Sequence, residues 1–438
     1  MKKHILSALL CIIYLALPPA APAQRPPESI RDSTPSLKEC YAGYFTIGAS
    51  SYADGEEENR IKEQKKESRK EKKQEKKKAK AQKKKGRNSS TVDEDDDQED
   101  EKPEPVEKSS FFVRTAGKHF TELSSGTELL PARLLGKKPK KFTRFTASDG
   151  LSYEVPAKWD SQYLSLFLDD AKRAGIHVRF HLLICPEMSP DWFFFRYYDT
   201  ASRLAGKDEM AARLEWYIKT VTDFISDWEQ EHNQGQALVT SYDVLSELFT
   251  DSGDLNLTPY NYLMKIFGDS SYAIQAFAFA SQCVPASVKL CYSDHSLFEK
   301  KKADKVKELI ISVRAADGSS RVDEIGIISH LMEDWPDREA FFGACRDFSS
   351  MGLDVQIQQL DMAARKRKDC GDAYFDFMRA CMKNSAYIKG VSFRAVNASE
   401  ETDFVDYMRS PLFTSEYSCT KNFDRIIEAA GHDTGSEK

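Results

Sequence analysis

Two stretches decide the fold: Thr240–Glu247, which reads TSYDVLSE, and Leu353–Met362, which reads LDVQIQQLDM. Both are short and rich in aliphatic residues that alternate with polar ones, so both predict β-strands. The first ends on the carboxylate of Glu247, and the second carries Gln359 and then Asp361 near its end. Polar residues at strand ends are where a (β/α)8 barrel keeps its chemistry, so these positions are the first candidates for a functional site.

Around these stretches the chain alternates predicted strands and helices. Eight strand candidates occur in order, at residues 41–49, 119–123, 176–184, 238–247, 288–292, 324–328, 353–360 and 388–393, and each is followed by a helical pattern. Apolar strands between helices favour a parallel sheet that is covered on both faces. The count predicts an α/β protein with a (β/α)8 TIM barrel, and a doubly wound open sheet is the alternative.

The N-terminal residues predict export. Residues 1–24 combine Lys2 and Lys3, an apolar run and a small-residue cleavage site, as a signal peptide does. We therefore expect a secreted, periplasmic or cell-surface protein without a transmembrane segment. A linker at 25–37 precedes the predicted barrel, which comprises residues 38–49 and 109–430, and a tail follows at 431–438.

A long, charged, low-complexity insertion, residues 50–108, separates the first predicted strand from the rest of the barrel. Its first half is rich in Lys and Glu, and residues 93–101 are strongly acidic. Such a composition predicts a largely disordered, solvated spacer, with attachment to a wall or membrane surface as the alternative. A polybasic run can also bind nucleic acid, but export and the adjacent acidic block argue against that partner.

The cysteines and histidines do not indicate a metal or a cofactor. Eight cysteines follow the predicted signal peptide without a CxxC pair, so we expect mostly buried thiols, with one or two disulfides that the spacing does not assign. His181 and His330 lack a carboxylate or histidine at ligand spacing, so we expect hydrogen-bonding roles rather than metal ligation. We also expect a monomer.

Five motifs in barrel order carry a resemblance. They are the opening segment 37–49, Gly175–His181 with Ser189–Phe193, Tyr242–Glu247, Ile325–Leu331 and Gly352–Met362. In this order the chain resembles the family 10 glycoside hydrolases, the β-1,4-xylanases with a TIM-barrel catalytic domain. The resemblance implies that Glu247 occupies the position of the acid/base and Gln359 that of the nucleophile.

The chain departs from the family pattern mainly at residues that would contact the sugar. Gln359 replaces a glutamate and Ser246 replaces an asparagine. The other departures are Gly126–Leu130 in place of E-N-E-M-K, Cys185–Pro186 in place of W-H, Ile328 in place of a glutamine and Arg394 in place of a tryptophan. A retaining glycosidase needs two carboxylates, and an amide cannot form the covalent glycosyl ester.

These observations predict a secreted, xylanase-like pseudoenzyme of carbohydrate metabolism that binds a β-linked glycan, such as xylan, or a surface partner. One alternative is an active O-glycosyl hydrolase with a rearranged pair, for which Glu128, Asp294 and Asp361 are candidate partners of Glu247. The other is a surface interaction protein without glycan affinity. The predicted substrate-binding residues are His181, Glu128, His330, Trp192, Ser246 and Asp361. Trp192 also suits a packed aromatic cluster.

If the protein binds a glycan, we expect the top face of the barrel to show it. Exposed aromatic side chains around an open cleft would favour it. A cleft filled by Leu129, Leu130, Ile328 and Arg394 would argue against it.

Overall fold

The computed structural model describes residues 34–50, 111–126, 129–363, 370–394, 410–414 and 418–432. The predicted signal peptide, residues 51–108 of the predicted insertion and Glu128 lie outside these residues.

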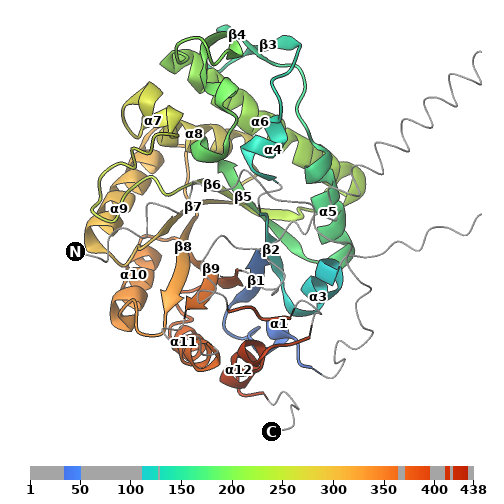
Figure 1. Ribbon diagram of the computed structural model, residues 1–438, viewed down its shortest axis with the longest axis vertical. Helices are drawn as coiled ribbons and strands as arrows, with labels where there is room; N and C mark the ends of the chain where they lie inside the picture. Colours follow the sequence, from blue (N-terminus) through green and yellow to red (C-terminus); the bar gives the residue numbers. More distant parts are fainter. Residues whose placement is uncertain are drawn as a thin grey trace, which may run out of the picture. The chain divides into compact units, whose positions relative to one another are not determined.

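Eight parallel strands close into a barrel, which confirms the predicted fold (Figure 1). Each strand pairs with the next one around the barrel, and β10 pairs with β1. The strands are β1 (Thr46–Ser50), β2 (Glu122–Ser124), β5 (His177–Ile184), β6 (Val239–Ser246), β7 (Lys289–His295), β8 (Glu324–Met332), β9 (Asp354–Ala363) and β10 (Gly390–Phe393).

Helices surround the barrel strands (Figure 1). The longer ones are α3 (Phe111–His119), α5 (Gln162–Ala174), α6 (Lys207–His232), α8 (Ser271–Cys283), α9 (Lys300–Ala315), α10 (Arg338–Ser350), α11 (Gly371–Lys383) and α12 (Lys421–Ala429). Their apolar residues recur at helical spacing; in α5, for example, Leu164, Leu168 and Ala171 are buried on one face. Three short helices are α1 (Leu37–Cys40), α4 (Pro131–Leu135) and α7 (Tyr262–Phe267).

Two predicted strands begin later than the sequence indicated. The first begins at Thr46, because residues 41–44 form a turn after α1 in which the buried Tyr41 donates its hydroxyl hydrogen bond to Ile426 O (2.6 Å). The second begins at Glu122, because His119 is the last residue of α3 and is fully buried. In both places aromatic residues that favour strands pack as core residues of a helix or turn instead.

The polar segment 136–156, which lies between the predicted strands at 119–123 and 176–184, forms an antiparallel hairpin of β3 (Phe142–Thr146) and β4 (Ser152–Pro156). The Asp149–Gly150 dipeptide at its turn is a common hairpin signal. The hairpin lies between β2 and α5 in the chain, so it belongs to the loop that leaves the carboxyl end of β2 (Figure 1).

All eight barrel strands point the same way, so their carboxyl ends meet at one end of the barrel, called the mouth below. The loop after β5 carries three short 3-10 helices at the mouth: η2 (Pro186–Met188), η3 (Asp191–Phe194) and η4 (Arg196–Tyr198). Loops at this end carry the functional residues of such barrels, so the candidate site is sought there.

Two features of the described part of the chain bear on the membrane and on the cysteines. None of its helices is both long and apolar enough to span a bilayer. Cys40, Cys283, Cys291, Cys345 and Cys381 are free thiols. For these five, the expectation of thiols rather than disulfides holds.

Candidate active site

Glu247 and Gln359 lie at the mouth in the same unusual backbone conformation. Glu247 directly follows β6 and Gln359 lies within the second half of β9, and their φ angles are 53° and 50°. The left-handed region is unfavourable for residues with a side chain. The fold therefore holds a strained backbone at both positions for which the family resemblance implies catalytic roles.

Gln359 ends a chain of hydrogen bonds that runs into the barrel. Its amide Nε2 donates to His181 Nε2 (3.2 Å), and His181 Nδ1 donates to Asp243 Oδ2 (2.7 Å). Asp243 Oδ1 accepts from the guanidinium of Arg179 (3.1 Å). The series Gln359–His181–Asp243–Arg179 is called the β9 relay below. It fixes His181 as the tautomer with a proton on Nδ1 and turns an amide N–H toward it.

The inner end of the β9 relay is an ion network in which Arg179 and Asp243 are buried and Glu122 is half-buried. Arg179 also contacts Glu324 Oε2 (2.8 Å) and Glu122 Oε1 (3.1 Å). Burial by itself would raise the pKa of Asp243, but the charge of Arg179 and the hydrogen bond from His181 lower it to about 2. Asp243 is therefore an ionised structural carboxylate, inaccessible to a substrate.

Glu247 ends a second series in which a histidine, an aspartate and a cation follow in the same order. Its Oε1 lies 3.7 Å from His295 Nδ1, and His295 Nδ1 lies 3.3 Å from Asp294 Oδ1. Asp294 in turn pairs with Lys302 Nζ at 2.7 Å, and both of these side chains are fully buried. The series Glu247–His295–Asp294–Lys302 is called the β6 relay. Asp251 joins it from the side, with its Oδ1 3.3 Å from His295 Nε2.

The β6 relay carries charge at its mouth end. Burial would lower the pKa of His295, but the neighbouring Asp251 and Glu247 carboxylates raise it to about 9. Burial would likewise raise the pKa of Glu247, but its interaction with His295 and the charge of Lys302 hold it below its ordinary value. Near neutral pH, Glu247 is therefore ionised beside an imidazolium. A proton donor to a leaving oxygen needs the opposite shift.

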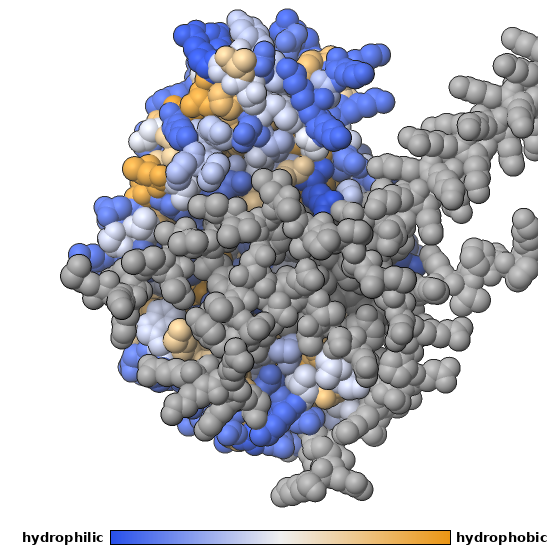
Figure 2. Space-filling model, viewed as in Figure 1, coloured by the Kyte–Doolittle hydropathy of each residue, from blue (hydrophilic) through white to orange (hydrophobic). Residues whose placement is uncertain are grey.

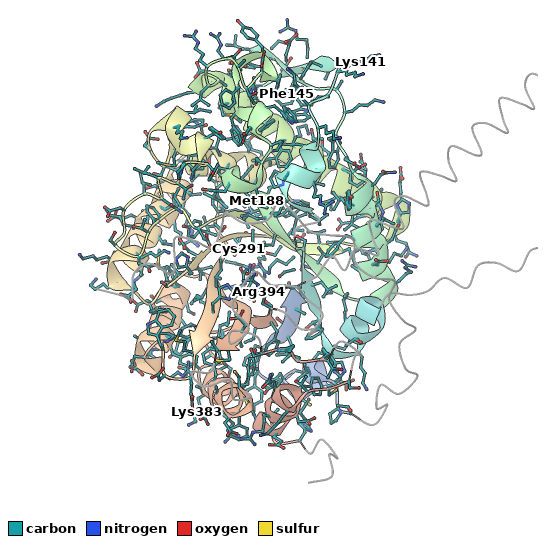
Figure 3. The ribbon with its side chains drawn as sticks, viewed as in Figure 1. Lys141, Phe145, Met188, Cys291, Lys383 and Arg394 are labelled. Atoms are coloured by element: carbon teal, nitrogen blue, oxygen red, sulfur yellow. The ribbon has the colours of Figure 1, made fainter. Side chains whose placement is uncertain are left out.

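His330 and Asp361 form a third pair at the mouth. Arg394 donates to His330 Nε2 (3.1 Å), so His330 Nδ1 carries the proton that it shares with Asp361 Oδ1 (3.1 Å). His330 also acts electrostatically on Glu247, which places this pair near the β6 relay. Figure 3 shows Arg394 near the middle of the barrel.

Trp192 is not a sugar platform at the mouth. Its side chain is buried, its indole N–H donates to Gly136 O (3.1 Å), and its ring packs against Phe193 and Tyr198. The structure places it in the packed aromatic cluster that was the other interpretation of the sequence. Ser246, the last residue of β6, is half-buried.

The rim of the mouth carries other aromatic side chains. Tyr197 is 72% exposed, Tyr260 48% and Trp335 43%, and they lie on the loops after β5, β6 and β8. Leu129 and Ile328 are buried, and Leu130 and Arg394 are half-buried. The mouth thus combines exposed aromatic rings with packed aliphatic residues.

Sequence reasoning missed His295, Asp251, Lys302 and Glu187. The predicted fifth strand ended at Tyr292, although β7 continues to His295 and brings Asp294 and His295 to the mouth. Asp294 and His295 come shortly after the predicted strand, and polar residues in that position could have indicated that they lie at the mouth. Glu187, in η2, accepts a hydrogen bond from Thr258 Oγ1 (2.9 Å), and burial raises its pKa.

The described residues offer no group of three or more His, Cys, Asp or Glu side chains arranged to hold a metal ion. What the geometry provides is an ionised carboxylate, an amide and three histidines, each bound to a carboxylate. Of the proposed partners of Glu247, Asp294 is fully buried on Lys302 and Tyr292, and Asp361 is bound to His330.

Comparison with known proteins identifies the family. Residues 145–429 match the sequence pattern of glycosyl hydrolase family 10. The chain belongs to this family. The predicted relationship and the predicted barrel are thereby both confirmed.

The relatives are xylanases by name. The bifunctional endo-1,4-beta-xylanase XylA of Ruminococcus flavefaciens is 28% identical over 330 residues, which are 75% of this chain and 32% of that protein. Endo-1,4-beta-xylanase A of Butyrivibrio fibrisolvens is 24% identical over 74% of this chain and 79% of its own length. This chain therefore spans about a third of the first relative and most of the second.

Solved family 10 structures share the fold. The intracellular xylanase of Thermoanaerobacterium saccharolyticum superposes with a TM-score of 0.64 at 18% identity, covering 91% of this chain and 100% of that one. The xylanase 10B modules of Clostridium thermocellum, solved with xylohexaose, superpose with a TM-score of 0.65 at 17% identity, covering 90% of this chain and 67% of that one. At this identity the likeness establishes the fold alone.

Proposed function

We propose that this protein is an exported member of glycosyl hydrolase family 10 that binds β-1,4-linked glycan at the barrel mouth and does not hydrolyse it by the retaining mechanism. The observation that carries the proposal is the amide of Gln359 in β9. It is hydrogen-bonded to His181 in the position where the family resemblance implies a carboxylate nucleophile. A retaining glycosidase forms a covalent ester with that carboxylate, and an amide does not.

The state of Glu247 supports the same proposal. An acid/base residue must be protonated to assist the leaving group, whereas His295 and Lys302 favour the ionised form of Glu247. Both parts of the retaining mechanism are therefore weakened. The exposed rings of Tyr197, Tyr260 and Trp335 support glycan binding, because aromatic faces pack well against the C–H faces of sugars.

The proposal is tested by measuring the release of reducing sugar from xylan and other β-1,4-glycans, together with calorimetric binding of xylo-oligosaccharides. The full chain is compared with its Gln359→Glu and Glu247→Gln variants. We expect the wild type to bind without releasing sugar. Release of sugar by the Gln359→Glu variant would show, in addition, that the substrate site is intact and that only the nucleophile is missing.

Two results would overturn the proposal. If the wild type releases sugar and Glu247→Gln abolishes the release, the protein is a hydrolase. If neither the wild type nor Gln359→Glu binds any of the oligosaccharides, the mouth does not bind these glycans, and a surface partner becomes the better hypothesis.

A second candidate function is hydrolysis by a rearranged pair, Glu187 and Glu247. The two residues follow adjacent strands, β5 and β6, and one loop contacts both: Thr258 Oγ1 donates to the Glu187 carboxyl, and Asn256 donates to Glu247 O (3.2 Å). Burial raises the pKa of Glu187, whereas that of Glu247 is lowered. Opposite shifts suit an acid and a base. In the same assay, this candidate requires both Glu187→Gln and Glu247→Gln to abolish a wild-type release of sugar.

A further inference from the structure

A strip of four lysines lies on the loop that leaves the mouth at β2. Lys137, Lys138, Lys140 and Lys141 are all exposed. Pro139 disfavours a helix for itself and for the residue before it, and the backbone bends at Lys137 and Lys140. At no more than about 3.6 Å per residue, the strip spans at most about 14 Å. Among the described residues no carboxylate lies within ion-pair distance of these lysines, although the whole chain has a net charge of −6.

The lysine strip is held beside the aromatic rim of the mouth. Gly136, directly before it, accepts the indole hydrogen bond of Trp192 from the loop after β5. Phe142, directly after it, stacks on Tyr198 with 4.6 Å between ring centroids. Tyr198 adjoins the exposed Tyr197, whose backbone is left-handed (φ 56°). The residues that flank the lysine strip therefore contact the loop that carries Tyr197, and the guanidinium of Arg196, 5.6 Å from the centroid of the Tyr197 ring, adds a positive charge there.

We infer that the lysine strip binds a carboxylate-bearing polysaccharide, a β-1,4-linked glycan with uronic acid units, as an extension of the glycan site at the mouth. Lysine ammonium groups are compact charges that pair with anions spaced along a polymer. An adjacent aromatic face takes the sugar ring. The inference deepens the proposed function and rests on it, because the mouth supplies the contact with the sugar backbone.

The surroundings of the strip favour a hydrated polymer over a bilayer. Phe142 and Phe145 are partly buried against the core and do not project into solvent beside the lysines. The exposed apolar side chain of the hairpin, Leu151, lies at the opposite end of β3, close to Asp149, whose charge an anionic membrane would repel. Around the position of β3 and β4, at the top of Figure 2, the visible surface is largely hydrophilic.

The test measures binding of a β-1,4-linked glucuronate oligosaccharide and of its neutral methyl ester to the full chain, in low and high salt. We expect the acidic oligosaccharide to bind at least tenfold more tightly in low salt, and the preference to disappear in high salt. Lys138→Gln with Lys141→Gln should weaken binding of the acidic form about fivefold and leave binding of the ester unchanged.

The matched control removes the same charge elsewhere. Lys383 and Lys389 are exposed near the start of β10, at the other end of the barrel, and Figure 3 shows Lys141 and Lys383 at opposite ends of the view. Lys383→Gln with Lys389→Gln should leave both affinities unchanged. Equal losses in the two double variants would mean a net-charge effect and would overturn the inference.

Four other outcomes separate the inference from the proposed function. Equal binding of acid and ester overturns the inference and leaves the proposed function standing. Binding of neither, while xylo-oligosaccharides still bind, overturns the inference alone, and loss of xylo-oligosaccharide binding as well overturns both. Phosphatidylserine vesicles and single-stranded oligothymidine are the competing anions. If either binds more tightly than the glucuronate, and if that binding depends on the lysines, the strip binds that anion and the inferred polysaccharide ligand is wrong.

Discussion

The two relays at the mouth share the order histidine, aspartate, cation, but they differ in the group that each presents at the mouth. Each runs from a residue in left-handed backbone through a histidine and a buried aspartate to a buried cation. In the β9 relay the three contacts are hydrogen bonds of 2.7–3.2 Å, and the mouth end is the neutral amide of Gln359. In the β6 relay the two outer contacts lengthen to 3.3 and 3.7 Å, and the mouth end is the ionised Glu247.

The difference teaches that the backbone of a site and its chemistry are separate properties. The fold holds both strand ends in the same strained conformation, yet only the β6 end presents a carboxylate. The charge of His295 follows from the carboxylates around it, since Glu247 and Asp251 both raise its pKa. The β9 relay has a similar framework and a different terminal group, which is why fold similarity alone does not establish activity.

The largest effect is expected at the inner ends of the relays. Asp243→Asn should lower the free energy of unfolding by about 3–5 kcal/mol, because it removes a fully buried carboxylate from a charged network. Asp294→Asn should cost less, about 1–3 kcal/mol, since burial outweighs Lys302 and raises the pKa of Asp294, so the fold stabilises its charge less well. Urea unfolding at pH 7 measures both.

Asp304→Asn is the control, because this exposed residue pairs with Lys300 on the surface and should give no measurable change. If Asp294→Asn lowers the free energy of unfolding as much as Asp243→Asn or more, the inner end of the β6 relay stabilises the fold at least as well as that of the β9 relay. The difference between the relays would then be confined to the mouth.

A smaller effect concerns pH and the β6 relay alone. His295 has a folded-state pKa of about 9, above its unfolded value of about 6.5. The protonated form is therefore favoured by folding, so this stability is present in full below pH 6.5 and is lost as the pH rises through 9. A shift of about 2.5 pKa units, at about 1.4 kcal/mol each, predicts that wild type loses about 3 kcal/mol across this window.

His295→Gln should remove this part of the pH dependence, since glutamine does not titrate. The difference between the urea midpoints of wild type and variant, followed from pH 6 to pH 10, isolates the contribution of His295 from other titrating groups. A difference that stays constant over this range would show that His295 is not charged by its neighbours.

The sequence was sufficient for the barrel because its signals are local and repeated. Strand and helix patterns alternate eight times, and the carboxyl ends of parallel strands converge on one end whatever the loops do. Tyr41 and His119 were predicted in strands because the aromatic residues beside them favour strands and nothing in the sequence pointed against it. Only the packed structure shows that their side chains fill the core between helices.

The candidate site was predictable only as far as the family motifs reach. Glu247 and Gln359 were found from their strand ends, and His181 and His330 from the motifs around them. His295 and Lys302 could not be assigned to the site, because their role arises from contacts between β7, α9 and the loop after β6 that no sequence spacing encodes. The hairpin beside the lysine strip was missed although its Asp–Gly turn was visible.

The smallest effect tests the feature that the relays share, the left-handed backbone. A glycine adopts this conformation without steric cost, whereas alanine does not. Gln359→Gly should therefore be more stable to urea than Gln359→Ala by about 1 kcal/mol, and Glu247→Gly should exceed Glu247→Ala by a similar amount. Both comparisons delete the side chain, so they isolate the contribution of the backbone.

Gln358, the neighbour within β9, is the control for this prediction. There the order of the two variants should reverse, because glycine weakens a strand. If the glycine advantage appears at one relay and not at the other, the two strand ends differ in backbone strain as well as in chemistry, and the parallel between them fails.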